Sequence, residues 1–185
     1  VFNKEFTHLK IHTQYSICEG ALRISDLAKY CKINQIKAVG LCDSNNLCGA
    51  LEFSETIAKS KTQPIIGTQI NIKYKDNIGK IPLFAKDLNG YKNLIKLSSK
   101  SFLEIKDDEE PHCKIEDIEK NYEGLILLSG TFDGLIGKLF FKNLTDEISV
   151  LFKRFKKIFK DNFYLEIQRH NDRGEKLFEK FLLNT

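Results

Sequence analysis

The sequence predicts an α/β fold in which short strands alternate with helices along the chain. Lys37–Asp43, PIIGTQINIKY from residue 64 and GLILLSG from residue 124 are runs typical of strands. Between them, apolar residues recur three and four positions apart, the spacing expected for helices that bury one face. Strands separated by helices over the full length favour parallel βα units, arranged as an open sheet or a barrel.

The elements of the first third follow from the same patterns. Phe6–His12 alternates between apolar and polar residues and predicts a strand. Apolar residues from Ile24 to Cys31 predict a helix, for which Ser25 is the expected N-cap. A second helix is predicted around Leu47–Ala58, and it ends before the next strand near Pro64.

Further along, the strand IPLFA leads into a helix that is predicted from about Asn89. The charged stretch Glu104–Pro111 predicts a surface loop, and we expect the adjacent His112 at the surface as well. Thr145 is the expected N-cap of a basic helix, with acidic residues favourably placed in its first turn. FYLEIQ, from residue 163, predicts the last strand before a terminal helix.

The most basic segment is FKRFKKIFK, residues 152–160, in a chain whose net charge of +4 comes from 29 basic and 25 acidic residues. Aromatic and cationic residues interleaved in this way could contact a phosphate backbone. Its apolar residues instead recur at helical spacing, which predicts a helix that faces the core and exposes a basic side to solvent. This apolar face comprises Ile148, Leu151, Phe152, Phe155, Ile158 and Phe159.

Composition indicates one globular domain over residues 1–185, because 42% of the residues are hydrophobic and no apolar run approaches the length of a membrane span. The five cysteines form no C-x-x-C pair, so neither a disulfide framework nor a cysteine-rich zinc site is expected, and a reducing cytoplasm is the expected setting. The chain contains no Met, and its last residues resemble a helix cut in mid-course. We therefore expect a fragment of a longer polypeptide.

Polar residues gather in the segments that follow the predicted strands, where such folds carry their chemistry. The first of these, THLKIHTQYSICEG from Thr7, holds His8 and His12 with Lys10 between them. The pair raises the question of a metal site. The other segments are Asp43–Asn46, Gly67–Gln69, Ser129–Thr131 and Gln168–Asn171.

These residues resemble a known family, the polymerase and histidinol phosphatase (PHP) domain at the amino end of bacterial DNA polymerase III alpha subunits. The resemblance is carried, in order and spacing, by THLKIHTQYSICEG, AVGLCDSNNLCGALEF, QPIIGTQINI, LFAKDLNGYKNLIKLSS, EGLILLSGTFDG and FYLEIQRHN. It implies a distorted β/α barrel, here incomplete at its C-terminal end. Catalytic members of the family hold a metal cluster that hydrolyses phosphoesters by activating a bound water.

The resemblance places the metal ligands of the family at seven positions of this chain. Only His12 and Glu19 keep a side chain able to bind a metal. The altered positions are Lys10, Ser44, Gln69, Lys80 and Thr131. A protonated ammonium group has no lone pair to offer and repels a divalent cation. We therefore expect neither a catalytic residue nor a metal site, and we expect Lys10 and Lys80 to supply positive charge to the remaining carboxylates. A last ligand motif, D-x-H, is expected beyond Thr185.

Four other polar residues have simpler expected roles. His8 is expected to pack in a strand, and Asp43 to cap or orient the loop that follows it, in preference to binding a cation. Arg169 and His170 close a predicted strand in the same region, where they could contact an anion such as phosphate or sulfate.

The resemblance implies that this chain is the N-terminal, non-catalytic PHP domain of a replicative polymerase, bracing the polymerase and docking a proofreading exonuclease. The whole polymerase, a DNA-directed nucleotidyltransferase, would extend DNA from dNTPs with magnesium held in a downstream domain. No cofactor is expected in this fragment, and no membrane partner. Two alternatives stay open: a metal-dependent 3′–5′ exonuclease or phosphoesterase with altered ligands, and a stand-alone phosphatase of the same superfamily.

Overall fold

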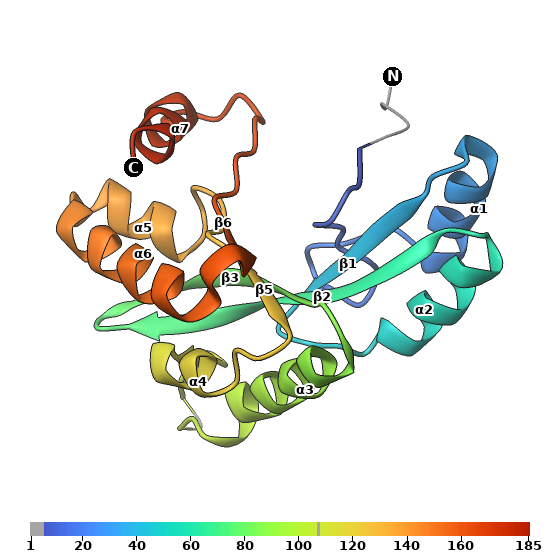
Figure 1. Cartoon of the computed structure of the whole chain (residues 1–185), viewed down its shortest axis with the longest axis horizontal. Coiled ribbons are helices and arrows are strands. Elements are labelled where there is room, and N and C mark those ends of the chain that lie inside the picture. Colours follow the sequence, from blue (N-terminus) through green and yellow to red (C-terminus); the bar gives the residue numbers. More distant parts are fainter. Residues whose placement is uncertain (1–5, 107) are drawn as a thin grey trace.

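The computed structural model describes residues 6–106 and 108–185, which form a mixed α/β structure (Figure 1). Its first half contains α1 (Ile24–Asn34), β1 (Ala38–Ser44), α2 (Ala50–Lys59), β2 (Gln63–Tyr74), β3 (Asn77–Ala85) and α3 (Leu88–Leu103). The second half contains β4 (Cys113–Lys114), α4 (Ile115–Lys120), β5 (Leu125–Leu128), α5 (Leu135–Phe141), α6 (Thr145–Phe159), the 3₁₀ helix η1 (Lys160–Asn162), β6 (Phe163–Tyr164) and α7 (Glu175–Leu183). The predicted α/β class is confirmed.

The strands form one sheet in the order β1-β2-β3-β5-β6, and β4 pairs with the far end of the long strand β2. β1 runs parallel to β2 and β5 runs parallel to β6, whereas β3 is antiparallel to both of its neighbours. The expectation of parallel units throughout is therefore wrong at β3. Only two residues separate Tyr74 from its partner Asn77, and a connection that short can join antiparallel strands alone. The open sheet is consistent with part of a distorted barrel.

Two predicted strands are shorter in the structure than in the sequence pattern. Phe6–His12 contacts β1 through an isolated parallel bridge between Ile11 and Leu41 and a hydrogen bond from Gly40 N to the His8 carbonyl, without forming a continuous ladder. FYLEIQ pairs only through Phe163 and Tyr164, because its partner strand β5 ends at Leu128. Beyond Tyr164 the chain continues without regular structure, which frees its side chains to face the cleft described below.

Helices cover the sheet and create two larger apolar clusters among the described residues. In one cluster, α1 and α2 pack through residues such as Leu27 and Phe53 against β1. In the other, helices α3 to α7 pack around β2, β3 and β5. The predicted basic helix is confirmed as α6, whose buried residues are Ile148, Leu151, Phe152, Phe155 and Phe159. Within the described segments, no helix is both long and apolar enough to span a membrane.

Both predicted N-caps are wrong, because each helix begins one or two residues earlier than predicted. Ser25 is the second residue of α1, whose cap is Arg23, and Thr145 is the first residue of α6, whose cap is Leu144. Neither cap side chain hydrogen-bonds to the helix. α1 begins at Ile24, which is fully buried, so the helix starts before the boundary that a polar cap at Ser25 would indicate.

His112 lies inside the structure, with 6% of its surface exposed, so its predicted surface position is wrong. Its backbone N–H donates to the Ser101 carbonyl, and its ring Nδ1 lies 2.8 Å from the Glu110 carbonyl oxygen. Asn71 of β2 donates its side-chain amide to Glu110 and to the Pro111 carbonyl. These bonds fold the charged loop back onto α3 and β2, which buries the residue that follows it.

Candidate functional site

The predicted site residues meet in one cleft beside the sheet, with a volume of about 490 Å³. Six of the seven positions implied by the resemblance line this cleft: Lys10, His12, Glu19, Gln69, Lys80 and Thr131. The seventh, Ser44, ends β1 and hydrogen-bonds to the cleft residues Glu19 and Gln69. Lys10 and Thr131, 121 positions apart in the chain, thus line the same cleft, as the sequence predicted from the segments that follow the strands.

The altered ligand positions bind one another. Lys80 and Ser44 each donate a hydrogen bond to Glu19, one to each carboxylate oxygen. Gln69 Nε2 donates to Ser44 Oγ over 2.8 Å. We call Glu19, Ser44, Gln69 and Lys80 the Lys80 cluster. Its Glu19 carboxylate, which the resemblance places at a ligand position, already accepts hydrogen bonds from an ammonium group and a hydroxyl.

The charge state of Glu19 follows from these contacts. Partial burial favours the neutral acid, but the hydrogen bonds from Lys80 and Ser44 outweigh it and lower the pKa of Glu19 below its ordinary value. Glu19 is therefore a carboxylate near neutral pH, and Lys80 balances its charge. The expectation that Lys80 supplies positive charge to this carboxylate is confirmed.

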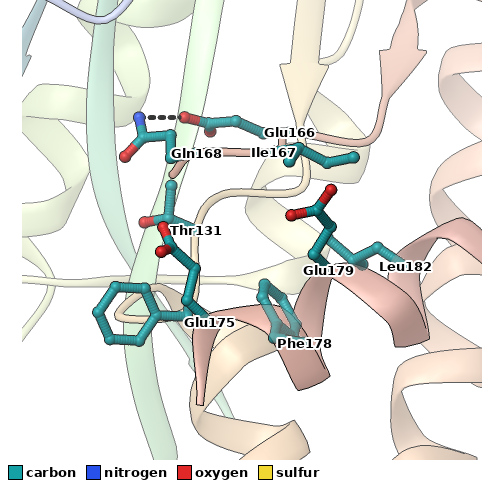
Figure 2. Close-up of a pocket in the computed structure, with 9 residues that line it drawn as sticks. Thr131, Glu166, Ile167, Gln168, Glu175, Phe178, Glu179 and Leu182 are labelled. Atoms are coloured by element: carbon teal, nitrogen blue, oxygen red, sulfur yellow. Dashed lines mark hydrogen bonds between the residues drawn. The ribbon is translucent and has the colours of Figure 1, made fainter. Parts of the chain in front are cut away.

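Lys10 forms a more deeply buried ion pair with Glu166, an acid that the sequence reasoning did not select. Lys10 Nζ lies 3.5 Å from Glu166 Oε1, and the two side chains are only 15% and 9% exposed. Burial raises the pKa of Glu166, while Lys10 and a 2.7 Å hydrogen bond from Gln168 oppose that rise (Figure 2). The sequence feature that could have identified Glu166 is its charge within FYLEIQ, a segment whose other residues follow a strand pattern.

Asp133 is a second acid of the cleft that the sequence reasoning missed. It accepts a hydrogen bond from Thr131, the residue at one altered ligand position. Burial acts to raise the pKa of Asp133, but this hydrogen bond and the charge of Lys10 outweigh it, so the pKa is lowered. The cleft therefore contains both signs of charge in close proximity.

His12 is the surviving imidazole, and its surroundings favour the neutral form. Burial and then the positive charge of Lys10 lower the pKa of His12. Its Nδ1 is buried and has no hydrogen-bond partner in the described part of the chain. A neutral imidazole nitrogen of this kind could bind a metal, so the fit of a metal has to be judged from the other donors.

The other donors do not fit the metal cluster that the family implies. Both oxygens of Glu19 accept hydrogen bonds from Lys80 and Ser44, and Lys10 places a cation where the resemblance puts a ligand. Across residues 6–106 and 108–185, no group of three His, Cys, Asp or Glu side chains is arranged to hold a metal ion. The side chains at this site are arranged as ion pairs instead.

Asp43 serves a structural role in the same region. It is fully buried, and its carboxylate accepts hydrogen bonds from Thr13 N (2.6 Å), Thr13 Oγ1 (2.7 Å) and Ser16 Oγ (2.6 Å). We call Asp43, Thr13 and Ser16 the Asp43 cluster. The prediction that Asp43 orients the loop that follows it is wrong, because its carboxylate holds the loop at residues 13–16 instead. His8 packs its ring edge-on against Phe6, with centroids 4.7 Å apart.

The two residues predicted to contact an anion point to different places. His170 lines the cleft, and its Nε2 lies 3.1 Å from Gln168 Oε1. Arg169 is largely exposed and pairs instead with Glu179 of α7, where its Nε lies 3.1 Å from Glu179 Oε2. The anion contact stays a prediction, and it would rest on His170 more than on Arg169.

A second, much smaller cavity lies between the segment after β6 and α7 (Figure 2). Its volume of about 10 Å³ is no more than one water requires, so it is not a ligand site. Glu175 of α7 accepts hydrogen bonds from the backbone N–H groups of His170 and Asn171, at 2.7 and 2.8 Å. These bonds hold the segment that carries Glu166 against α7.

Comparison with known proteins supports the resemblance. Residues 8–170 match the PHP domain family. DNA polymerase III subunit alpha of Rickettsia prowazekii is 39% identical over 95% of this chain, and that of Borreliella burgdorferi is 36% identical over 98%. The chain spans only 15% and 17% of the lengths of these relatives.

Among solved structures, a metal-dependent phosphoesterase described as putative, from Bifidobacterium adolescentis, aligns with 51% of this chain and 32% of its own, with 18% identity and a TM-score of 0.42. The assignment rests on the sequence matches, which cover nearly the whole chain. The chain belongs to the PHP domain family and is homologous to part of the DNA polymerase III alpha subunit.

Proposed function

We propose that this PHP domain is a non-catalytic part of a replicative DNA polymerase chain, which it braces and through which it docks a proofreading exonuclease. One observation carries the proposal: Lys10 and Lys80, both at family ligand positions, form ion pairs with Glu166 and Glu19. Each ammonium group neutralises a carboxylate, which is the electrostatic role a metal cation would have. The cleft is therefore held together by its own side chains.

The remaining parts of the proposal concern the longer chain. We propose that the whole polypeptide is a DNA-directed DNA polymerase that acts on DNA and dNTPs in the cytoplasm. Its magnesium would be held by carboxylates in a different domain, and this domain would need no cofactor. The names of the homologous relatives support this context.

A second candidate is a metal-dependent phosphoesterase with altered ligands, and the buried Nδ1 of His12 favours it. Against it stand the two lysines, because a cation at a ligand position has to be displaced or deprotonated before a metal could bind nearby. This candidate makes the opposite prediction about metal content, so one measurement separates the two.

The test is elemental analysis of the purified polymerase chain after dialysis against a weak chelator. We expect no stoichiometric zinc, manganese or iron. A matched control would restore ligand-type residues by the substitutions Lys10→His, Ser44→His, Gln69→Glu and Lys80→His, and this variant should retain metal. Retention of about two or more such metals by the unsubstituted chain, together with chelator-sensitive nuclease activity, would favour the phosphoesterase.

The docking role is tested by titrating the proofreading exonuclease into the polymerase chain with and without residues 1–185. We expect the affinity to fall sharply when these residues are removed. Polymerase activity of the truncated chain, measured after brief heating, reports on bracing in the same preparations. Unchanged affinity would refute docking, and unchanged heat resistance would refute bracing.

A further inference from the structure

The outer face of α3 carries an apolar stripe that nothing in the described structure covers. Leu88, Ile95 and Phe102 recur at every seventh residue, and their side chains are 69%, 43% and 52% exposed. Leu103, at the end of the helix, is 80% exposed. The helix buries its opposite face through Leu94 and Leu97 and lies at the edge of the molecule beneath the sheet (Figure 1). Both faces of α3 are thus partly apolar.

The spacing of the stripe suits another helix. Residues seven positions apart lie on one side of an α-helix, and a repeat of this kind forms the seam between two packed helices. α3 has 16 residues, which gives the seam a length of about 24 Å at 1.5 Å per residue. We call Leu88, Ile95, Phe102 and Leu103 the α3 stripe.

Charge around the α3 stripe indicates the character of its partner. Lys92 and Lys96 are exposed on the same face, one and two turns after Leu88. Neither forms an ion pair with any other residue that the structure describes, in contrast to Lys100, which pairs with Glu104 and Asp117. A partner that presents carboxylates beside its own apolar residues would match this face in both shape and charge.

From the exposed stripe and its flanking lysines, we propose that α3 docks an acidic amphipathic helix from the remainder of the same polypeptide. The proposal rests on the proposed function, in which this domain belongs to a longer polymerase chain. The homologous relatives are several times longer than residues 1–185, so most of such a chain is available to supply the helix. A second copy of this face is a poor partner, because a symmetric contact would bring Lys92 and Lys96 of both copies together. The α3 stripe is then the surface through which the domain braces the polymerase.

The experiment is hydroxyl-radical footprinting of the full-length polymerase chain, read by mass spectrometry of individual side chains. We expect Ile95 and Phe102 to be oxidised several-fold more slowly than their exposure in this domain predicts. Ile33 of α1 and Leu51 of α2, which are 79% and 70% exposed, serve as references on other helices. Carbodiimide crosslinking should join Lys92 or Lys96 to an Asp or Glu outside residues 1–185.

A matched pair of variants sharpens the assignment. Ile95→Glu places a carboxylate in the middle of the stripe, and it should restore fast oxidation of Leu88 and Phe102. Ile33→Glu makes the same change at an exposed apolar residue of α1, and it should leave their oxidation slow. Crosslinking of the unsubstituted chain does not depend on either variant folding.

Several results would overturn the proposal. Oxidation of the α3 stripe at the rate its exposure predicts would show a free surface. Protection that appears only at high protein concentration would indicate a second copy, and protection that requires added exonuclease or anionic vesicles would indicate a separate protein or a membrane. If the stripe is free but removal of residues 1–185 still lowers heat resistance, this inference fails and the bracing role stands.

Discussion

The last two residues of β1, Asp43 and Ser44, belong to two polar clusters that differ in burial. Asp43 is fully buried, and within the described residues the hydrogen bonds to its carboxylate come from the loop at residues 13–16. Its neighbour Ser44 points to the opposite side of the strand, into the Lys80 cluster, where Lys80 and Glu19 are 28% and 38% exposed. A buried carboxylate is costly to leave unsatisfied, whereas an exposed ion pair contributes little. Stability should therefore depend on the Asp43 cluster, and the ligand positions can change at small cost.

The largest effect is expected at Asp43. Asp43→Ala leaves three buried donors without an acceptor, and we expect it to lower the free energy of unfolding by about 3 kcal/mol or more, since each buried unsatisfied group costs about 1–3 kcal/mol. Urea unfolding of the chain measures the effect. Asp26→Ala removes an exposed carboxylate that pairs with Lys29 and should change the free energy by less than about 0.5 kcal/mol. Equal effects of the two variants would contradict the contrast.

The Lys10–Glu166 pair should show an intermediate effect, because both partners are mostly buried. Lys10→Met replaces the ammonium group with an uncharged thioether, so the buried Glu166 carboxylate loses its positive partner. We expect the free energy of unfolding to fall by about 2 kcal/mol, in the range of hydrogen bonds to charged groups. Adding Glu166→Leu should recover most of this loss, because a buried pair can be replaced by apolar side chains with little net cost. The pKa of His12, followed by NMR, should also rise in Lys10→Met, since Lys10 lowers it. If the two substitutions were simply additive, the pair would not be coupled.

The smallest effect is expected at the Lys80–Glu19 pair. Lys80→Ala should cost about 0.2–1 kcal/mol at neutral pH, and the difference should shrink in high salt. The pKa of Glu19 is lowered in the folded chain, so its contribution is present above the ordinary pKa of 4.5 and is lost as the pH falls through the folded value. The free energies of unfolding of the Lys80→Ala variant and the unsubstituted chain, measured by urea unfolding across this acid range, should therefore converge. A difference that persisted in acid would place the role of Lys80 elsewhere.

Local patterns predicted the strand at β1, the long strand β2 and the amphipathic helix α6, because burial of one face or of a whole run leaves a periodic signal. The same patterns failed at Phe6–His12 and at FYLEIQ. FYLEIQ has too short a partner, because β5 ends at Leu128. Phe6–His12 lies beside β1, but its pairing with that strand is an isolated bridge and not a continuous ladder. The predicted surface position of His112 was wrong for a related reason, since a polar loop gives no sign in the sequence that it folds back onto a helix.

Residue types in their order and spacing were enough to predict the α/β class and the family, and the resemblance placed Lys10, Ser44 and Lys80 at ligand positions. The contacts that those residues make depend on how the elements pack together. The pairing of Lys10 with Glu166 joins positions far apart in the chain, and no local pattern encodes such a contact. Which loop the Asp43 carboxylate holds, and the exposure of the α3 stripe, likewise depend on packing between elements and not on the elements alone.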